Sequence, residues 1–352
     1  MITADDRDRL RAVASRYGVR AVDDVAFGAL PLERHEVEED SADRLADLGW
    51  ERAAGAWGPI ATGGSPARPP RRFVDGSVNG RTVATLTVAD RMRPALLAVV
   101  GAMAMDLDGR ELRRSPGTVR TESMLCLFAN QLPAADLDAL EGGLSGMGVT
   151  LVAPTKTDLT ADFEVLRRRT WDLAKRCMED AERDVLVKDP TVPCLLDGLL
   201  ERRVTTVASQ AIPAFGMVKR QLSPLLPERL AGLVYRLAPG ERTPAFVLDT
   251  EHASIVTWYL RLSDPGRASP TAGIVRLSAT RAYLESAFTD LADRAAEISG
   301  VSAWLRSLRC RQASYKRAAV SVEPIVRLED QLHSLLPSLS KLTARLHRAF
   351  GC

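Results

Sequence analysis

The sequence RFVDGSVNGRTVATLTV, residues 72–88, is followed almost at once by the apolar run PALLAVVGAMAMD, residues 94–106. The second run is continuously apolar, which is typical of a central strand buried on both faces. In the first run, Arg72–Asp75 predicts a short strand and the alternating, β-branched Thr82–Val88 predicts another. Asn79-Gly80 between them is a strong hairpin signal. We therefore expect a β-sheet core in which Asp75 ends the first strand.

The residues after this core alternate between helix and strand patterns. Asp162–Asp184 has apolar residues at helical spacing with charges between them, and Thr160 is its expected N-cap. Such alternation predicts an α/β fold with a mixed sheet. Further strands are expected at 118–128, 149–152, 192–197, 213–219, 245–248, 254–262 and 273–277, and further helices at 137–146, 281–297, 303–311 and from 328 onward.

The N-terminal segment has a different character. Residues 4–18 and 33–55 have the apolar periodicity of helices. Residues 58–72, GPIATGGSPARPPRR, are rich in proline and glycine, as linkers are. We therefore expect a helical N-terminal region over 1–57, a linker over 58–72, and the main domain over 73–352.

Composition excludes several classes of protein. The 352 residues are 46% hydrophobic and 26% charged, as in globular domains, and the net charge of +2 means that any nucleic-acid contact needs a local basic patch. The five cysteines form no CxxC pair, which argues against a zinc ribbon and fits a reducing cytoplasm. There is no GxSxG and no Walker A sequence, so the chain does not look like a hydrolase of acyl groups or an NTPase. The longest apolar run is about half of a membrane span, and the charged start does not fit a signal peptide.

Two Asp-Gly pairs, Asp75-Gly76 and Asp197-Gly198, each follow an apolar strand pattern. A carboxylate at the end of a buried strand costs free energy unless it is paired or bound to metal. On neighbouring strands, two such carboxylates can hold Mg²⁺ or Mn²⁺, and a pair of ions can promote phosphodiester hydrolysis. Taken singly, an Asp-Gly pair after a strand is more often an ordinary turn.

The helix at 162–184 offers a third carboxylate. Asp172 and Glu179 are seven residues apart and share a helix face, and Glu182 lies near the same stripe. Most charges on an amphipathic helix are simply solvated. The pattern leaves open which of the three acids reaches the sheet edge.

Two later strands carry candidates for contact with a nucleic acid. Lys219 ends the strand at 213–219 and can meet a phosphate as a point charge, or be a solvated strand end. Trp258, Tyr259 and Arg261 lie on the strand at 254–262, where stacking on bases competes with core packing, the commoner role.

In this order, the motifs resemble those of the NurA nucleases, which act with a HerA-type hexameric translocase in DNA-end processing. The resemblance extends over roughly residues 70–335 and rests on order and spacing, because each segment is short. The matching segments are FVDGS at 73–77, RTWD at 169–172, CLLDGL at 194–199, GMVK at 216–219, WYLRL at 258–262 and IVR at 274–276.

The resemblance implies an RNase H-like mixed sheet flanked by helices, and a DNA nuclease that uses Mn²⁺ or Mg²⁺. It also implies a homodimer and a HerA-type ATPase as partner. Asp75 and Asp197 would be metal ligands, with Asp172 or Glu179 as the helical acid. Lys219 would match the lysine at the end of the middle strand.

The C-terminal motif is where the chain departs most from this family. Its best match to the last ligand is Asp330, and His333 lies one helical turn further on. The family tyrosine has no clear counterpart, because Tyr315 lies too early in the chain. This departure keeps open a catalytically inactive NurA-like binding or regulatory subunit, whose carboxylates would lie too far apart to share an ion. A third reading is an unrelated α/β enzyme acting on a small molecule, without an RNase H-like strand order.

Overall fold

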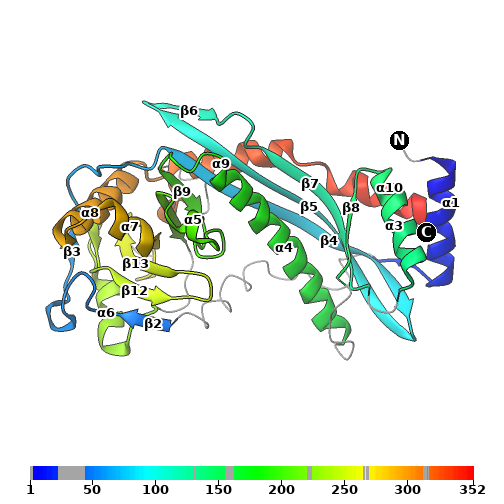
Figure 1. Ribbon diagram of the computed structural model, residues 1–352, viewed down its shortest axis with the longest axis horizontal. Coiled ribbons are helices and arrows are strands. Elements are labelled where there is room, and N and C mark those ends of the chain that lie inside the picture. The colour runs from blue at the N-terminus through cyan, green and yellow to red at the C-terminus, as the bar shows by residue number, and fades with distance from the viewer. Residues whose placement is uncertain are drawn as a thin grey trace.

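Two long strands form the spine of the molecule. The computed structural model describes residues 3–22, 44–129, 132–154, 162–219, 224–264, 266, 269–311, 315 and 317–352. Strands β4 (Arg72–Val88) and β5 (Arg91–Asp108) pair antiparallel along almost their whole length. Figure 1 shows this hairpin running between the two ends of an elongated molecule.

The turn of the hairpin lies at Ala89 and Asp90. These residues have φ angles of 49° and 60°, the left-handed conformation that tight hairpin turns require. The predicted turn at Asn79-Gly80 is wrong, because both residues pair with β5 inside the ladder. Gly80 has a packing role instead, since a Cβ atom there would lie 3.3 Å from the Trp171 side chain.

Five strands at the centre of the sheet have the RNase H-like order β7-β5-β4-β9-β10. β5 pairs antiparallel with β7 (Arg120–Cys126) on one side and with β4 on the other. β9 (Cys194–Asp197) pairs in parallel with β4, and β10 (Ala214–Val218) pairs in parallel with β9. The predicted α/β fold, with an RNase H-like mixed sheet flanked by helices, is confirmed.

The sheet continues beyond β10 through antiparallel strands to the N-terminal strand β2 (Arg44–Asp47). We expected a helix over 33–55, but its described part holds β2 and the single turn η4 (Ala54–Ala56), and 33–43 lie outside the described residues. Pairing with the sheet edge overrides the local helical periodicity. The other strands are β1 (Arg20–Ala21), β3 (Ile60–Ala61), β6 (Glu111–Arg114), β8 (Thr150–Val152), β11 (Glu241–Arg242), β12 (Phe246–Asp249), β13 (Ser254–Arg261) and β14 (Ile274–Thr280).

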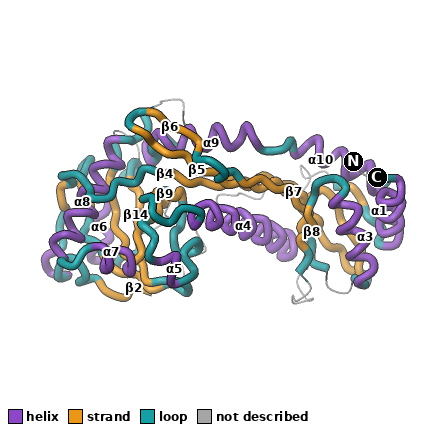
Figure 2. The backbone as a smooth tube through the Cα atoms, turned by 45° about the horizontal axis from the view of Figure 1, so that its top comes forward, coloured by secondary structure: helices purple, strands orange, loops and turns teal. Residues whose placement is uncertain are grey.

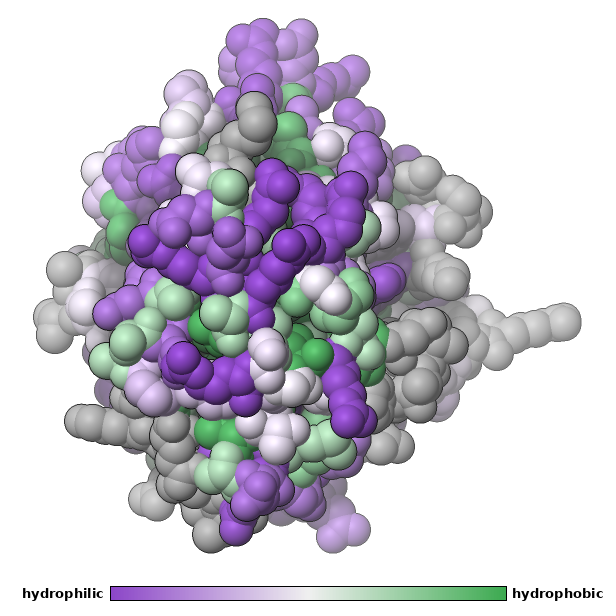
Figure 3. Space-filling view, turned by 90° about the vertical axis from the view of Figure 1, so that its right-hand side faces the viewer, coloured by the Kyte–Doolittle hydropathy of each residue, from purple (hydrophilic) through white to green (hydrophobic). Residues whose placement is uncertain are grey.

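Helices cover both ends of the molecule. α1, α3 and α10 gather at one end, and Figure 3, which looks onto that end, shows polar residues with small apolar patches between them. In the part of the chain that the structure describes, no helix is both long and apolar enough for a membrane span. The helices are α1 (Ala4–Arg16), α3 (Ala134–Ser145), α4 (Phe163–Val187), α5 (Val207–Gln210), α6 (Glu228–Arg236), α7 (Arg281–Ala287), α8 (Leu291–Ser307), η5 (Ala318–Val320), α9 (Glu323–Leu335) and α10 (Leu339–Phe350).

Two long helices, α4 and α9, pack on opposite faces of the hairpin (Figures 1 and 2). The expected helix over 162–184 is confirmed as α4, with Asp162 as its N-cap, whereas Thr160 lies outside the described residues. Along β4, Val74 belongs to the core that includes Val185 of α4, and Phe73 to the core that includes Leu328 of α9. Because side chains alternate along a strand, residue 75 faces α9 and residue 76 faces α4.

Candidate metal centre

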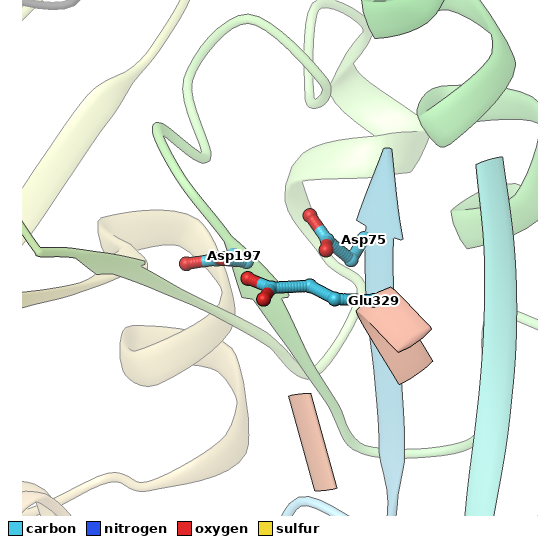
Figure 4. A group of neighbouring side chains, drawn as sticks. All are labelled: Asp75, Asp197 and Glu329. Atoms are coloured by element: carbon cyan, nitrogen blue, oxygen red, sulfur yellow. The ribbon is translucent and has the colours of Figure 1, made fainter. Parts of the chain in front are cut away.

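Three carboxylates meet where β4 and β9 part. The two strands pair in parallel as far as Val74 and Leu196, so the next residue of each, Asp75 and Asp197, lies just beyond the last paired position. Glu329 reaches the same place from α9. One carboxylate oxygen from each of the three residues lies within 4.8 Å of the other two. Figure 4 shows the three side chains and the elements from which they come.

Asp75 is the most enclosed of the three. It is 7% exposed, and among the described residues its one hydrogen bond comes from the backbone N–H of Gly76, at 2.9 Å. Burial, and then the charge of Asp197, raise the pKa of Asp75 well above its usual 3.8, although Lys219 opposes them. A buried carboxylate with so little compensation is costly in the ionised form, and a bound cation would remove that cost.

Lys219, directly after β10, holds two of these carboxylates. Its Nζ lies 2.6 Å from Oδ2 of Asp197 and 3.2 Å from Oε1 of Glu329, and its side chain is 5% exposed. Burial alone would lower the pKa of Lys219, but the two carboxylates outweigh it and raise that pKa. We expected Lys219 to be a phosphate contact or a solvated strand end, and the structure instead buries it in an ion-pair network.

Tyr315 completes this network. Its hydroxyl donates a hydrogen bond to Oε2 of Glu329 at 2.5 Å. Burial, and then this hydrogen bond, raise the pKa of Tyr315, so the phenol stays protonated as a donor. In the sequence Tyr315 lies too early to match the family tyrosine, but the fold brings it to the cluster.

In the C-terminal segment, the acid that joins the cluster is Glu329, one position before the expected Asp330. α9 turns Ile325 and Leu328 into the core, and Glu329 follows Ile325 by one helical turn on the same face. Asp330 and His333 are exposed, which turns them away from the sheet. The apolar spacing of this helix was therefore a signal that could have identified Glu329.

The acids of α4 lie on the other face of β4. Gly76 faces them so closely that a Cβ atom there would lie 2.6 Å from Oε1 of Glu182. Glu182 is 1% exposed, and its Oε2 accepts hydrogen bonds from Nε and Nη2 of Arg203 at 2.8 and 2.5 Å. Burial raises the pKa of Glu182, and the guanidinium of Arg203 opposes that shift.

Glu179, the second α4 acid, contacts the same guanidinium. Its Oε1 lies 3.5 Å from Nη1 of Arg203, and Oε2 lies 3.7 Å from Nη1 of Arg202. Asp172 lies ten residues before Glu182 on α4. This places it about 15 Å from Glu182 along the helix axis. Among the described residues, none of these α4 acids belongs to the group of three carboxylates whose oxygens lie within 4.8 Å of one another.

The side chains of Trp258, Tyr259 and Arg261 on β13 lie in the core rather than on a binding surface. Each is at most 1% exposed. Trp258 donates from Nε1 to Oγ of Ser302 at 2.9 Å, and Arg261 donates to backbone carbonyls, including that of Leu237. Stacking of these side chains on bases is therefore ruled out by their burial.

The three carboxylates fit a divalent cation chemically. Their donors are carboxylate oxygens, which Mg²⁺ and Mn²⁺ prefer, and no sulfur or imidazole ligand accompanies them within the described group. Together with the ammonium of Lys219, they leave an excess of negative charge at a partly exposed position. One divalent cation would balance it.

Comparison with solved structures gives a likeness in fold to a nuclease. No protein-family model and no curated protein matches this sequence. The crystal structure of the NurA nuclease from Sulfolobus solfataricus overlaps 79% of this chain and 88% of its own, with 10% sequence identity and a TM-score of 0.35. Similarity at this level establishes neither a family nor an activity, so the fold assignment rests on the strand order itself.

Proposed function

We propose that this chain is a divalent-metal-dependent nuclease whose Mn²⁺ or Mg²⁺ is held by Asp75, Asp197 and Glu329. One observation carries the proposal: three carboxylates, from β4, β9 and α9, converge within 4.8 Å where the central parallel strands diverge. When bound, such an ion activates a water molecule and neutralises charge that develops on a phosphodiester.

The residues around the ligands would orient them. Lys219 holds one oxygen of Asp197 and one of Glu329, and Tyr315 holds the other oxygen of Glu329. These contacts limit the rotation of two ligands, so that the three carboxylates keep one geometry. Groups that orient metal ligands in this way typically affect metal affinity or activity by about 10- to 100-fold.

The proposal extends to DNA as substrate, a HerA-type translocase as partner, a homodimer and a cytoplasmic location. The order of motifs in the sequence supports the substrate and the partner. A net charge of +2 also suits a protein that shares its grip on DNA with a partner ring. Convergence of the carboxylates favours an active enzyme over an inactive subunit, and the RNase H-like strand order disfavours an unrelated α/β enzyme.

Cleavage of end-labelled linear DNA tests the proposed activity. We expect cleavage with Mn²⁺ and none with a chelator. In Asp75→Asn the rate should fall by at least about 100-fold, because loss of a residue that only orients a metal ligand already costs about 10- to 100-fold. Asp180→Asn, which removes an α4 acid paired with Arg183 at the surface, is the control and should cleave normally. Undiminished cleavage by both Asp75→Asn and Asp197→Asn would refute the site.

The proposed partnership has its own test. DNA affinity is measured over a salt titration, with and without a HerA-type translocase. We expect weak, salt-sensitive binding by the chain alone and tighter binding with the partner, because phosphate contacts dominate non-specific affinity. Tight binding by the isolated chain would contradict the partnership and leave the nuclease proposal standing.

A further inference from the structure

The two faces of β4 at Asp75 and Gly76 carry separate groups of charges. On the α9 face, three carboxylates accompany the single ammonium of Lys219. On the α4 face, Glu179 and Glu182 contact the guanidinium groups of Arg202 and Arg203. The first group therefore carries more negative than positive charge, whereas in the second group two carboxylates face two guanidinium groups.

We propose that Arg203 takes the place of a second metal ion, so that the chain binds one divalent cation. This inference rests on the proposed nuclease function and specifies how many ions that site uses. In two-metal sites the ions lie about 3.5–4 Å apart, so a second ion would need a further acid within reach of the first ion. Glu182 is the nearest candidate on α4, and its carboxylate is bound to Arg203.

The contacts of Arg203 leave little freedom to release Glu182. Its side chain is 5% exposed. Nε and Nη2 both donate to Glu182, while Nη1 donates to the carbonyl of Leu199 at 3.1 Å and also contacts Glu179. The guanidinium is therefore held in one orientation by partners on α4 and on the segment after β9.

The backbone after Asp197 explains how Arg203 reaches this position. Gly198 has a φ of 126°, a backbone conformation that residues other than glycine rarely adopt. The chain turns there from the end of β9 toward α4 and delivers Arg203 to the acids of that helix. Glu201, buried on the same segment, adds a negative charge that favours the charged form of Arg203.

The location of Glu182 also separates it from the three-carboxylate group. Its Oε1 lies against Gly76, on the face of β4 opposite Asp75. Among the described residues, the oxygens that lie within 4.8 Å of one another include none from α4. An ion shared by Asp75 and Glu182 would have to displace Arg203 and shift this carboxylate around the strand.

The number of Mn²⁺ ions bound to the full chain tests the inference. Equilibrium dialysis with Mn²⁺ alone should give one ion per chain, and electron paramagnetic resonance should show no coupling between manganese ions. Asp75→Asn should lose that ion at the same Mn²⁺ concentration. Two ions in the unmodified chain, with a coupled spectrum, would overturn the inference but not the proposed function, whereas no bound ion would overturn the proposed function itself.

Substitution of Arg203 makes the test specific. Arg203→Met leaves Glu179 and Glu182 without this cation and should gain a second Mn²⁺. In the double variant Arg203→Met, Glu182→Gln, the count should return to one. A folded Arg203→Met protein that still binds one ion would show that Arg203 does not replace a second ion. Arg203→Lys, which keeps the charge, should remain at one ion and provides a readout should Arg203→Met not fold.

Discussion

Asp75 and Gly76 are neighbours on one strand, yet they face opposite electrostatic environments. On the α9 side, burial and Asp197 raise the pKa of Asp75 well above its usual value. On the α4 side, Glu182 is at least as buried but is bound by Arg203. Burial alone therefore does not mark a metal ligand. The balance of charge around the carboxylate separates a proposed ion site from a structural ion pair.

The sharpest way to break this contrast is to remove the cation of the α4 face. Arg203→Met should destabilise the metal-free protein by about 3–5 kcal/mol, because it leaves buried carboxylates uncompensated. Denaturant unfolding measures the loss. Arg183→Met, which removes a surface ion pair with Asp180, is the control and should cost no more than about 1 kcal/mol. Equal losses in both variants would mean that the α4 network is not a buried one in solution.

The next test concerns the acid on α9. Glu329→Gln should reduce Mn²⁺-dependent cleavage by about 100-fold or more, because it removes a proposed metal ligand. Loss of a residue that only orients such a ligand already costs about 10- to 100-fold. Asp330→Asn, one position along and exposed, should cleave at a rate close to that of the unmodified chain. Initial rates at saturating Mn²⁺ distinguish the two. The reverse order of effects would restore Asp330 as the ligand.

A smaller effect should follow from adding a methyl group to β4 on the face that packs against α4. Gly76→Ala places a Cβ atom 2.6 Å from Oε1 of Glu182, and overpacking of this kind costs about 1–3 kcal/mol. Gly142→Ala, where a Cβ atom meets nothing within 4 Å on α3, is the matched control. Thermal unfolding compares them. The cost at Gly76 should shrink when Glu182→Ala is added, and an unchanged cost would show that the clash lies elsewhere.

The mildest signature is the pH dependence of stability. The pKa of Asp75 is raised in the folded state, so the folded chain binds this proton more tightly than the unfolded chain does. That contribution is fully present below 3.8, the ordinary value, and is lost as the pH rises through the raised pKa. Melting temperatures of the metal-free protein should fall over this range, and the fall should be weaker in Asp75→Asn. Mn²⁺ should offset it, since the ion binds the deprotonated carboxylate.

Much of this fold is readable from local patterns. The apolar run before Asp106, the helix α4 and the strand that ends at Asp197 follow from periodicity and from residue type. Two Asp-Gly pairs after apolar strands pointed to Asp75 and Asp197, and the order of the other motifs favoured these aspartates over ordinary turns. These features depend on residues that are close together in the chain, and this is why local sequence patterns predict them.

The features that local patterns missed depend on distant contacts. Asn79-Gly80 has the sequence of a turn, but β5 offers hydrogen-bond partners throughout and keeps the strand extended. The choice between Glu329 and Asp330 depends on which face α9 turns to the sheet. Arg203 has no motif at all, because its role arises only when the segment after β9 packs against α4.

The position of Glu329 has a consequence for the order in which the molecule gains its proposed activity. Asp75 belongs to an early strand and Glu329 to a helix near the other end of the chain. During synthesis, the sheet can therefore form around two aspartates that still lack their third partner. The proposed metal centre is completed only when α9 docks, so a growing chain would have no competent site until this helix has left the ribosome.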